Sequence, residues 1–199
     1  MLQLGINPFA LSRCDSKDVN AECENYDEMM NLTRKQNTVI VTHIGEALFD
    51  VDVIKSELFA ALGYSEGSCV NTLGSVVEFT GYVRADKVSE GQPLVTAIEL
   101  EHYPAMTEKA LDGIINKALS RFDCLGIALV HRVGRMAVGE PIVYVSVLTS
   151  HRKEGFACAQ FLMDYLKSEV PLWKREYFAE KSRWVDQKLS DVASLSRWD

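Results

Sequence analysis

The sequence has few cysteines and lacks the long apolar runs that mark membrane proteins. Its five cysteines form no CxxC pair, which argues against a disulfide framework or a zinc site and favours free thiols in a reducing cytosol. No apolar run approaches the ~20 residues that a membrane span needs. Residues 1–18 also lack the basic start and apolar stretch of a secretory signal. We therefore expect a cytoplasmic protein.

Motifs for nucleotide binding, serine hydrolysis and metal binding are missing as well. There is no GxGxxG, no phosphate-binding loop and no GxSxG. The four histidines are scattered and form no HxxxH pair. We expect neither a bound metal nor a redox cofactor.

Acidic residues outnumber basic ones overall, but positive charge is concentrated in one part of the chain. The formal net charge is −7, which argues against a nucleic-acid-binding protein, since such a protein needs a basic face. Residues 151–188 nevertheless carry eight lysines and arginines against six acids. A locally basic region on an acidic protein indicates a small anionic ligand.

Regular structure is predicted from residue 38 onward. Residues 1–37 are polar without clear periodicity, and we interpret them as an extension, partly disordered or with one short helix near 24–35. Residues 38–199 form one domain. Strands are predicted at 38–43, 74–83, 94–103, 127–134 and 141–150, and helices from Asp50 or Asp52 to Leu62, at 104–122 and at 152–169, followed by an irregular tail. Short connections within two strand pairs indicate an α+β fold, a largely antiparallel sheet with helices packed against it.

His151 and Arg152 lie where a predicted buried strand gives way to a helix. A helix N-terminus exposes unpaired N–H groups and the positive end of the helix dipole, so anions bind there. An added arginine suits a phosphate ligand. A surface arginine beside a packed histidine is the alternative that position alone leaves open.

Two lysines flank the end of that helix. Lys167 lies in its last turn, at the border of the apolar face, where partial burial would help it to lose a proton. A solvated lysine stabilised by the helix dipole is the plainer alternative. Lys174 follows in VPLWKRE, where Pro171 ends the helix and Trp173 is predicted to be buried and to hold the lysine in place.

Two further cations are candidates, and one pair is interpreted as structural. Arg84 ends a strong strand beside a polar loop, a common placement for ligand binding, although a generic surface arginine is equally compatible. Lys188 follows an aromatic residue in WVDQK. His131 and Arg132 lie in the middle of a strand, and we interpret them as structural. We expect a single compact cationic cavity where the long helix starts and ends.

Taken together, these segments resemble one family. FTGYVR (79–84), LEHYPAMTEKAL (100–111), HRVGRMAVGE (131–140), TSHRKEGFACAQFLMDYLK (149–167), VPLWKRE (170–176) and RWV (183–185) look like the large, catalytic subunit of molybdopterin synthases, in order and in spacing. The resemblance runs from about residue 38 to residue 188. Residues 1–37 have no counterpart in the compact members of the family.

The resemblance implies a reaction and its partners. Cyclic pyranopterin monophosphate would receive two sulfurs as a dithiolene and become molybdopterin. The sulfur would arrive as a thiocarboxylate on the C-terminal Gly-Gly of a small ubiquitin-like subunit, in a heterotetramer with a dimer of large subunits at its centre.

The same resemblance implies roles for the candidate cations. Lys167 corresponds to the main catalytic lysine and Lys174 to a second one. Arg84, His151 and Arg152 are expected at the substrate. Lys188 stands where the family often has an arginine, which keeps the charge but not the two-pronged guanidinium.

Three other functions remain to be distinguished. One is an inactive family member that acts as a binding or regulatory partner of the sulfur carrier, against which the intact lysines, arginines and histidine argue. Another is the carrier itself, but this chain ends in LSRWD and not in Gly-Gly. The third is a nucleic-acid-binding domain, which the net acidity disfavours.

Overall fold

The computed structural model describes residues 30–35, 37–63, 72–86, 93–179, 181–186 and 193–198. The chain divides into two units, Met1–Met30 and Asn31–Asp199, and every described helix and strand lies in the second. Most of the expected N-terminal extension, and the helix expected near 24–35 up to residue 29, therefore lie outside the described residues.

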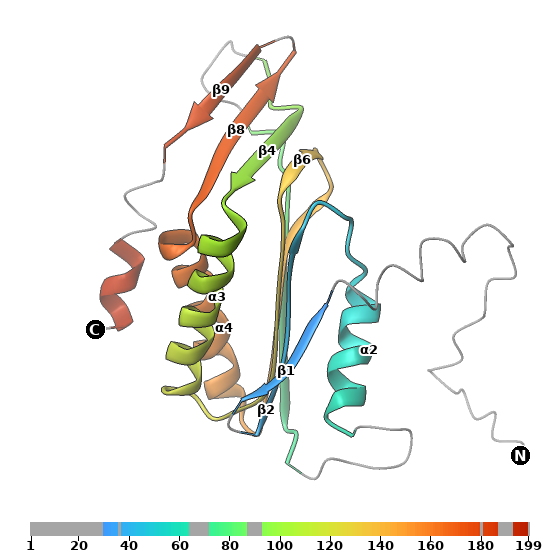
Figure 1. The fold of residues 1–199 in the computed structure, drawn as a ribbon, viewed down its shortest axis with the longest axis vertical. Helices are drawn as coiled ribbons and strands as arrows, with labels where there is room; N and C mark the ends of the chain where they lie inside the picture. Colours follow the sequence, from blue (N-terminus) through green and yellow to red (C-terminus); the bar gives the residue numbers. More distant parts are fainter. Residues whose placement is uncertain are drawn as a thin grey trace, which may run out of the picture. The chain divides into compact units, whose positions relative to one another are not determined.

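The larger of two sheets has five strands in the order β1-β2-β5-β7-β3 (Figure 1). They are β1 (Asn31–Lys35), β2 (Thr38–Gly45), β5 (Cys124–Arg132), β7 (Pro141–Thr149) and β3 (Ser75–Tyr82). β2 and β5 pair in parallel, and the other neighbours are antiparallel. The central strands β5 and β7 are buried along almost their whole length, which is why their sequences are nearly continuous apolar runs.

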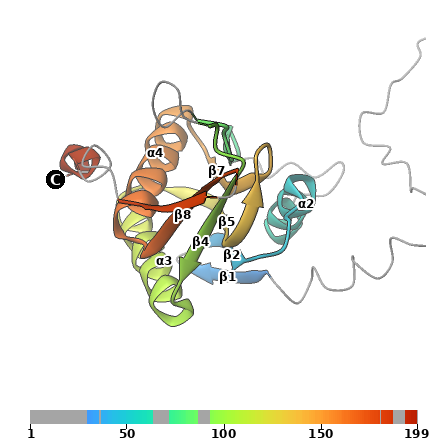
Figure 2. The ribbon, with the colours of Figure 1, turned by 90° about the horizontal axis from the view of Figure 1, so that it is seen from above.

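Helices cover both faces of this sheet (Figures 1 and 2). α3 (Pro104–Leu119) and α4 (Arg152–Glu169) lie side by side on one face, and α2 (Val51–Ala61) lies on the other. Local signals explain where two of them begin. Asp50 caps α2 by accepting hydrogen bonds from the backbone N–H groups of Asp52 and Val53, and Pro104 occupies the first turn of α3.

The main hydrophobic core lies between the five-stranded sheet and the α3–α4 layer. Its largest side chains come from both helices and from the central strands, among them Ile114, Ile115, Phe161, Leu162 and Leu129. The short helix η1 (Ser194–Trp198) closes the outer side of α4, where Trp198 packs 5.2 Å from the Phe161 ring centroid. This packing holds α4 firmly, so both ends of that helix have defined positions.

The second sheet has four antiparallel strands in the order β6-β4-β8-β9. They are β6 (Gly134–Ala137), β4 (Ala97–His102), β8 (Leu172–Phe178) and β9 (Lys181–Val185). One face of this sheet contributes to a small separate core of five buried residues, Val83, Val95, Ile98, Leu100 and Met136.

The α+β class with mostly antiparallel strands is confirmed, and three details differ from the sequence prediction. The strands form two sheets rather than one. The segment assigned to the extension contains a strand, β1, whose backbone pairs with β2 along its whole length. The tail predicted to be irregular contains β8 and β9, which pair with each other and, through β8, with β4. Charged side chains on both faces of β8 hid the apolar alternation by which strands are predicted.

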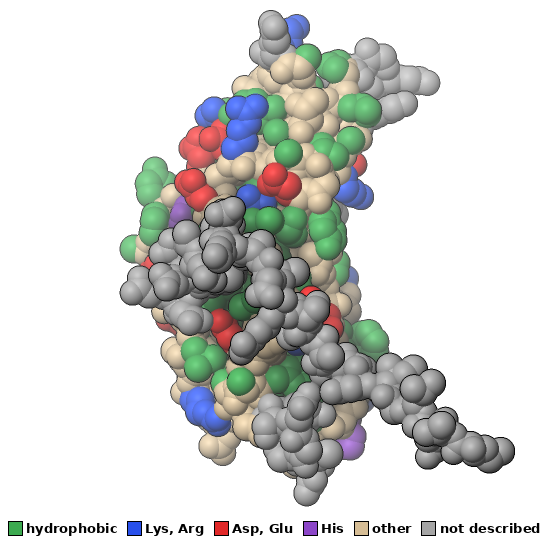
Figure 3. Space-filling view, turned by 90° about the vertical axis from the view of Figure 1, so that its right-hand side faces the viewer, with side chains coloured by type: hydrophobic (Ala, Val, Ile, Leu, Met, Phe, Trp, Pro, Cys, Tyr) green, Lys and Arg blue, Asp and Glu red, His purple; other side chains and the backbone are tan. Residues whose placement is uncertain are grey.

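None of the helices in the described part of the chain is long and apolar enough to cross a membrane. On the face drawn in Figure 3, the described basic and acidic side chains are interspersed, with hydrophobic side chains between them.

Candidate functional site

The start of α4 presents His151 and Arg152 to solvent. His151 is the N-cap residue with an extended backbone, and its ring makes no capping hydrogen bond. Its carbonyl oxygen instead accepts from Thr149 Oγ1 at 2.9 Å and from the Gly155 N–H at 3.3 Å. The backbone of residue 151 is therefore fixed while the imidazole stays exposed. Arg152 follows as the first helical residue and is exposed too, so an imidazole and a guanidinium stand at the positive end of the helix dipole.

A pocket of about 610 Å³ lies at the start of α4. It is lined by Gly74, Ser150, His151, Arg152, Lys153 and Phe156. Gly74 is required there, since a Cβ at this position would lie 2.1 Å from the carbonyl oxygen of Ser150. The Gly74 N–H donates to Thr149 O at 3.0 Å, which ties the entry to β3 to the end of β7. The pocket therefore has a fixed backbone wall and a cationic side.

Lys167 lies in the last turn of α4 and is exposed, next to the buried Leu166. Fifteen residues separate it from Arg152 on one continuous helix, and a rise of 1.5 Å per residue puts the two Cα atoms ~22 Å apart along the axis. One compact cavity built from both ends of α4 is therefore not present within a single chain, and this expectation was wrong. The rigid helix that positions both residues also keeps them apart.

Arg84 follows β3 by two residues, at the end of the strand remote from the start of α4. The pairing of β3 with β7 places Ser75 opposite Thr149 and Tyr82 opposite Pro141. The Arg84 side chain is exposed and its Nη2 lies 3.0 Å from Asp86 Oδ2. α4 starts after Thr149 and packs back along β7 and β3. Arg84 therefore belongs with the Lys167 end of the molecule and not with His151.

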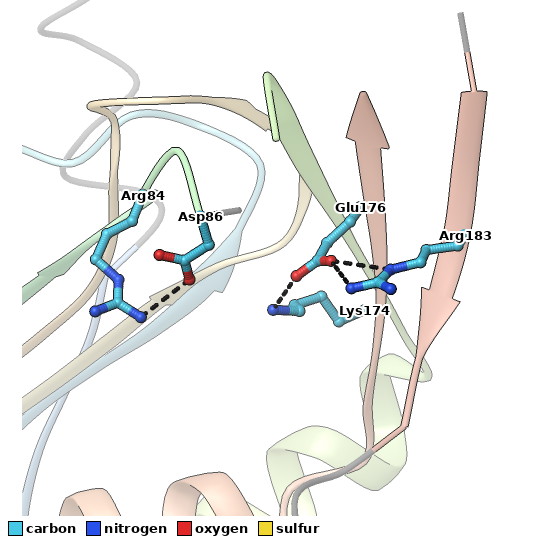
Figure 4. Close-up of polar contacts among 5 residues, drawn as sticks. All are labelled: Arg84, Asp86, Lys174, Glu176 and Arg183. Atoms are coloured by element: carbon cyan, nitrogen blue, oxygen red, sulfur yellow. Dashed lines mark hydrogen bonds and ion pairs between the residues drawn. The ribbon is translucent and has the colours of Figure 1, made fainter. Parts of the chain in front are cut away.

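Lys174 is on β8, where it forms part of a three-residue ion cluster with Glu176 and Arg183 (Figure 4). Its Nζ lies 2.8 Å from Glu176 Oε1, while Arg183 Nη2 lies 2.9 Å from the other carboxylate oxygen. Figure 4 shows both cations on the Glu176 carboxylate and draws them together with the Arg84–Asp86 pair. The Lys174 side chain is 37% exposed, so its charge can still be reached by a ligand.

Sequence reasoning missed Glu176 and Arg183. Burial alone would raise the pKa of the Glu176 carboxyl, but hydrogen bonds and charges from Lys174 and Arg183 outweigh burial and lower the pKa. The carboxylate therefore stays charged in a side chain that is only 9% exposed. The signal that could have found this cluster is the spacing of Lys174 and Glu176, which puts both on one face of a strand.

Trp173 is not buried, contrary to the prediction. It points to the opposite face of β8 from Lys174, is 44% exposed, and meets the Tyr103 ring edge-on with 5.2 Å between centroids. A second pocket, of about 360 Å³, lies on that face between Tyr103, Trp173 and Trp184. What holds Lys174 is thus the ion cluster rather than a buried tryptophan.

His131 and Arg132 are both buried, in line with a structural role. His131 Nδ1 lies 2.7 Å from the Arg132 carbonyl oxygen. Arg132 donates to Glu140 Oε2 at 2.8 Å and to the backbone oxygens of Pro141 and Glu46. This buried arginine thus joins the ends of three chain segments, which is a structural role.

Three further predictions concern Lys188, metal binding and the cysteines. Lys188 lies outside the described residues, so its place stays a prediction. In the described part of the chain, no group of three or more His, Cys, Asp or Glu side chains could hold a metal ion. Of the five cysteines, Cys124 and Cys158 are described, and both are free, buried thiols with 3.5 Å between their sulfurs.

Comparisons with known proteins identify close relatives. A family model described as MoaE protein matches residues 51–169. Proteins named molybdopterin synthase catalytic subunit are similar to this chain. The one from Ralstonia nicotianae is 46% identical over 126 residues (63% of this chain, 70% of the relative), and the one from Escherichia coli is 44% identical over 125 residues (63% and 81%). A solved MoaE protein from Burkholderia ambifaria has 40% identity and a TM-score of 0.62, with 80% of this chain and 96% of that chain covered. A molybdopterin synthase from Staphylococcus aureus has 26% identity and a TM-score of 0.58, with 72% and 95% covered.

Proposed function

The chain belongs to the MoaE protein family, and from that membership we propose that it is the catalytic subunit of a molybdopterin synthase, an enzyme of molybdenum cofactor biosynthesis. The observation that carries the proposal is the family match over residues 51–169. That range includes four of the candidate site residues, Arg84, His151, Arg152 and Lys167. The curated relatives bear the name of this enzyme.

The proposed reaction adds two sulfurs to cyclic pyranopterin monophosphate and so forms the dithiolene of molybdopterin. The sulfur donor is the C-terminal thiocarboxylate of a small ubiquitin-like subunit. Both the phosphate and the thiocarboxylate are anions, and the groups proposed to meet them are cations on an otherwise acidic chain. We place the enzyme in the cytoplasm, where its buried free thiols Cys124 and Cys158 would stay reduced.

The start of α4 is proposed to bind the phosphate of the pterin. Unpaired N–H groups of the first helical turn, the Arg152 guanidinium and the exposed His151 ring all offer hydrogen-bond donors. The pocket of about 610 Å³ beside them leaves room for a ligand of this size class.

Lys167 and Lys174 are proposed to act on the reacting groups. An ammonium near the thiocarboxylate orients the sulfur and stabilises negative charge that develops on the acyl oxygen, and a lysine can move a proton during the transfer. Lys174 is held for this by Glu176, whereas Lys167 is carried by the end of a well-packed helix. Arg84, and Lys188 beyond the described residues, are proposed to supply further positive charge to the substrate.

A dimer of this subunit would bring the separated cations together. His151 and Arg152 are one helix length from Lys167 in a single chain, but a second copy can place its α4 start beside the Lys167 end of the first. Two small subunits bound to such a dimer complete the proposed heterotetramer. A twofold dimer with two equivalent composite sites is the ordinary symmetry for such an assembly.

The function is tested with purified protein, the thiocarboxylated small subunit and cyclic pyranopterin monophosphate, with molybdopterin as the measured product. Wild type should form product, and Lys167→Ala should abolish sulfur transfer without a change in thermal unfolding, because the side chain is exposed. Lys109→Ala is the matched control, an exposed lysine on α3. Near-normal turnover by Lys167→Ala would overturn the role of Lys167. An inactive wild type would overturn the proposed function and favour a binding or regulatory role.

A further inference from the structure

We infer that Arg183 is a positioning residue for Lys174 and acts through Glu176, the carboxylate that the two cations share. The inference rests on the proposed function, since it concerns how the Lys174 ammonium is presented to the pterin and to the sulfur donor. Arg183 itself need not touch either of them.

The contacts of Arg183 fix both the place and the rotation of the Glu176 carboxylate. Arg183 approaches Oε2 with two nitrogens, Nη2 at 2.9 Å and Nε at 3.3 Å. Its guanidinium carbon also lies 5.7 Å from the centroid of the Phe178 ring. Because one oxygen is held by a planar fork, the other oxygen, Oε1, has a defined direction, and it is this oxygen that contacts Lys174 Nζ at 2.8 Å.

The strand register explains why these three residues meet. β9 runs antiparallel to β8, with Arg183 directly opposite Glu176. Lys174 lies two residues before Glu176 on β8, so its side chain leaves on the same face. On the other side of β8, the partner of Glu176 is Ile98 of β4, which offers no charge. Among the described residues, the nearby Arg84 and Asp86 are paired with each other at 3.0 Å.

The balance of charge in this cluster gives Arg183 its effect. Two cations share one carboxylate, so the cluster keeps one net positive charge. With Arg183 in place, the Glu176 charge is already compensated, and the half-buried Lys174 ammonium can attract an incoming anion. Without Arg183, Lys174 would be the sole partner of a nearly buried carboxylate, which draws the ammonium away from the substrate.

The test compares variants of the complete enzyme in the molybdopterin assay. Arg183→Gln should lower kcat/KM at least about tenfold, the lower end of the effect of losing hydrogen bonds to a charged group, and Arg183→Lys should recover part of the loss by restoring the charge. Arg175→Gln is the matched control. Arg175 lies on the opposite face of the same sheet, 3.4 Å from Glu101 and over the Trp184 ring, and its loss should leave kcat/KM close to wild type.

Two further measurements separate positioning from a general structural effect. In a Glu176→Gln background, Arg183→Gln should lower kcat/KM no further, because Arg183 acts through that carboxylate. The acidic limb of the kcat/KM profile should also move to higher pH in Arg183→Gln, since Glu176 loses one of the two cations that lower its pKa. Arg175→Gln should not move this limb.

The outcomes distinguish this inference from the proposed function. A wild-type enzyme that forms no product refutes both. If wild type is active and Lys174→Ala is inactive, but Arg183→Gln behaves like Arg175→Gln, only the inference fails. A full additional tenfold loss from Arg183→Gln in the Glu176→Gln background would show that Arg183 acts independently of the shared carboxylate.

Discussion

The buried imidazole of His131 should make the stability of the protein depend on pH in a window where few other groups titrate. Burial lowers the pKa of His131 from 6.5 to about 4, an effect to which the nearby His102 adds, while the hydrogen bond to the Arg132 carbonyl opposes it. Between these two pKa values the unfolded chain binds a proton that the folded protein does not. Stability from the neutral imidazole is therefore fully present above about pH 6.5 and is lost as the pH falls toward 4.

The size of the effect follows from the two pKa values. Lowering the pH from about 7 to about 5 should reduce the free energy of unfolding by about 2 kcal/mol, with about 1 kcal/mol more lost on the way to pH 4. The lowered pKa of Glu176 contributes in the same direction only at more acidic pH, below about 4.5. The window between pH 7 and 5 thus isolates the histidine.

Urea unfolding at several pH values in this window measures the effect. His131→Gln should be less stable than wild type at neutral pH, but its free energy of unfolding should change much less between about pH 7 and about pH 5. His151→Gln, which removes an exposed histidine, should keep the wild-type slope. If wild type loses no stability in this window, or if His131→Gln keeps the full slope, the buried neutral imidazole is not the cause.

Three other substitutions test separate parts of the structure. Gly74→Ala places a Cβ 2.1 Å from the Ser150 carbonyl oxygen and should lower the free energy of unfolding by about 1–3 kcal/mol; an unchanged melting temperature would contradict this close approach. Glu140→Ala removes the 2.8 Å partner of the buried Arg132 and should cost about 1–3 kcal/mol, with Glu140→Gln costing less in the same urea titration. Arg84→Ala should change stability by less than about 0.5 kcal/mol, because the side chain is 75% exposed, yet it should raise the KM for the pterin; an unchanged KM would remove Arg84 from the site.

The helices were the most predictable part of the fold. The predicted helix at 152–169 coincides with α4, and the helix predicted at 104–122 begins at Pro104 as observed and ends at Leu119. Both depend on signals within a few residues, such as apolar spacing and a proline in the first turn. The predicted helix also fixes the distance between the ends of α4, because the rise per residue is constant. That distance already contradicts a single compact cavity built from both ends.

Three of the strands were less predictable. β1, β8 and β9 have mixed polarity. β1 pairs with β2, and β8 pairs with β4, a strand that is distant from it in sequence. The surroundings of Lys174 were hidden for the same reason. Trp173 was predicted to be a buried anchor, but the alternation of side chains along β8 puts it on the exposed face and Glu176 on the buried one.

By itself, the sequence determined the family, the α+β class, the helix limits and the identity of the candidate cations, because motifs, caps and helical periodicity are local properties of the chain. Only the tertiary structure decided that β8 and β9 form a hairpin beside β4, that Arg183 and Lys174 share the Glu176 carboxylate, and that Arg84 lies at the Lys167 end of the molecule. These facts depend on strand pairing between distant segments, whose register is set by the packing of the whole sheet and not by any short stretch of sequence.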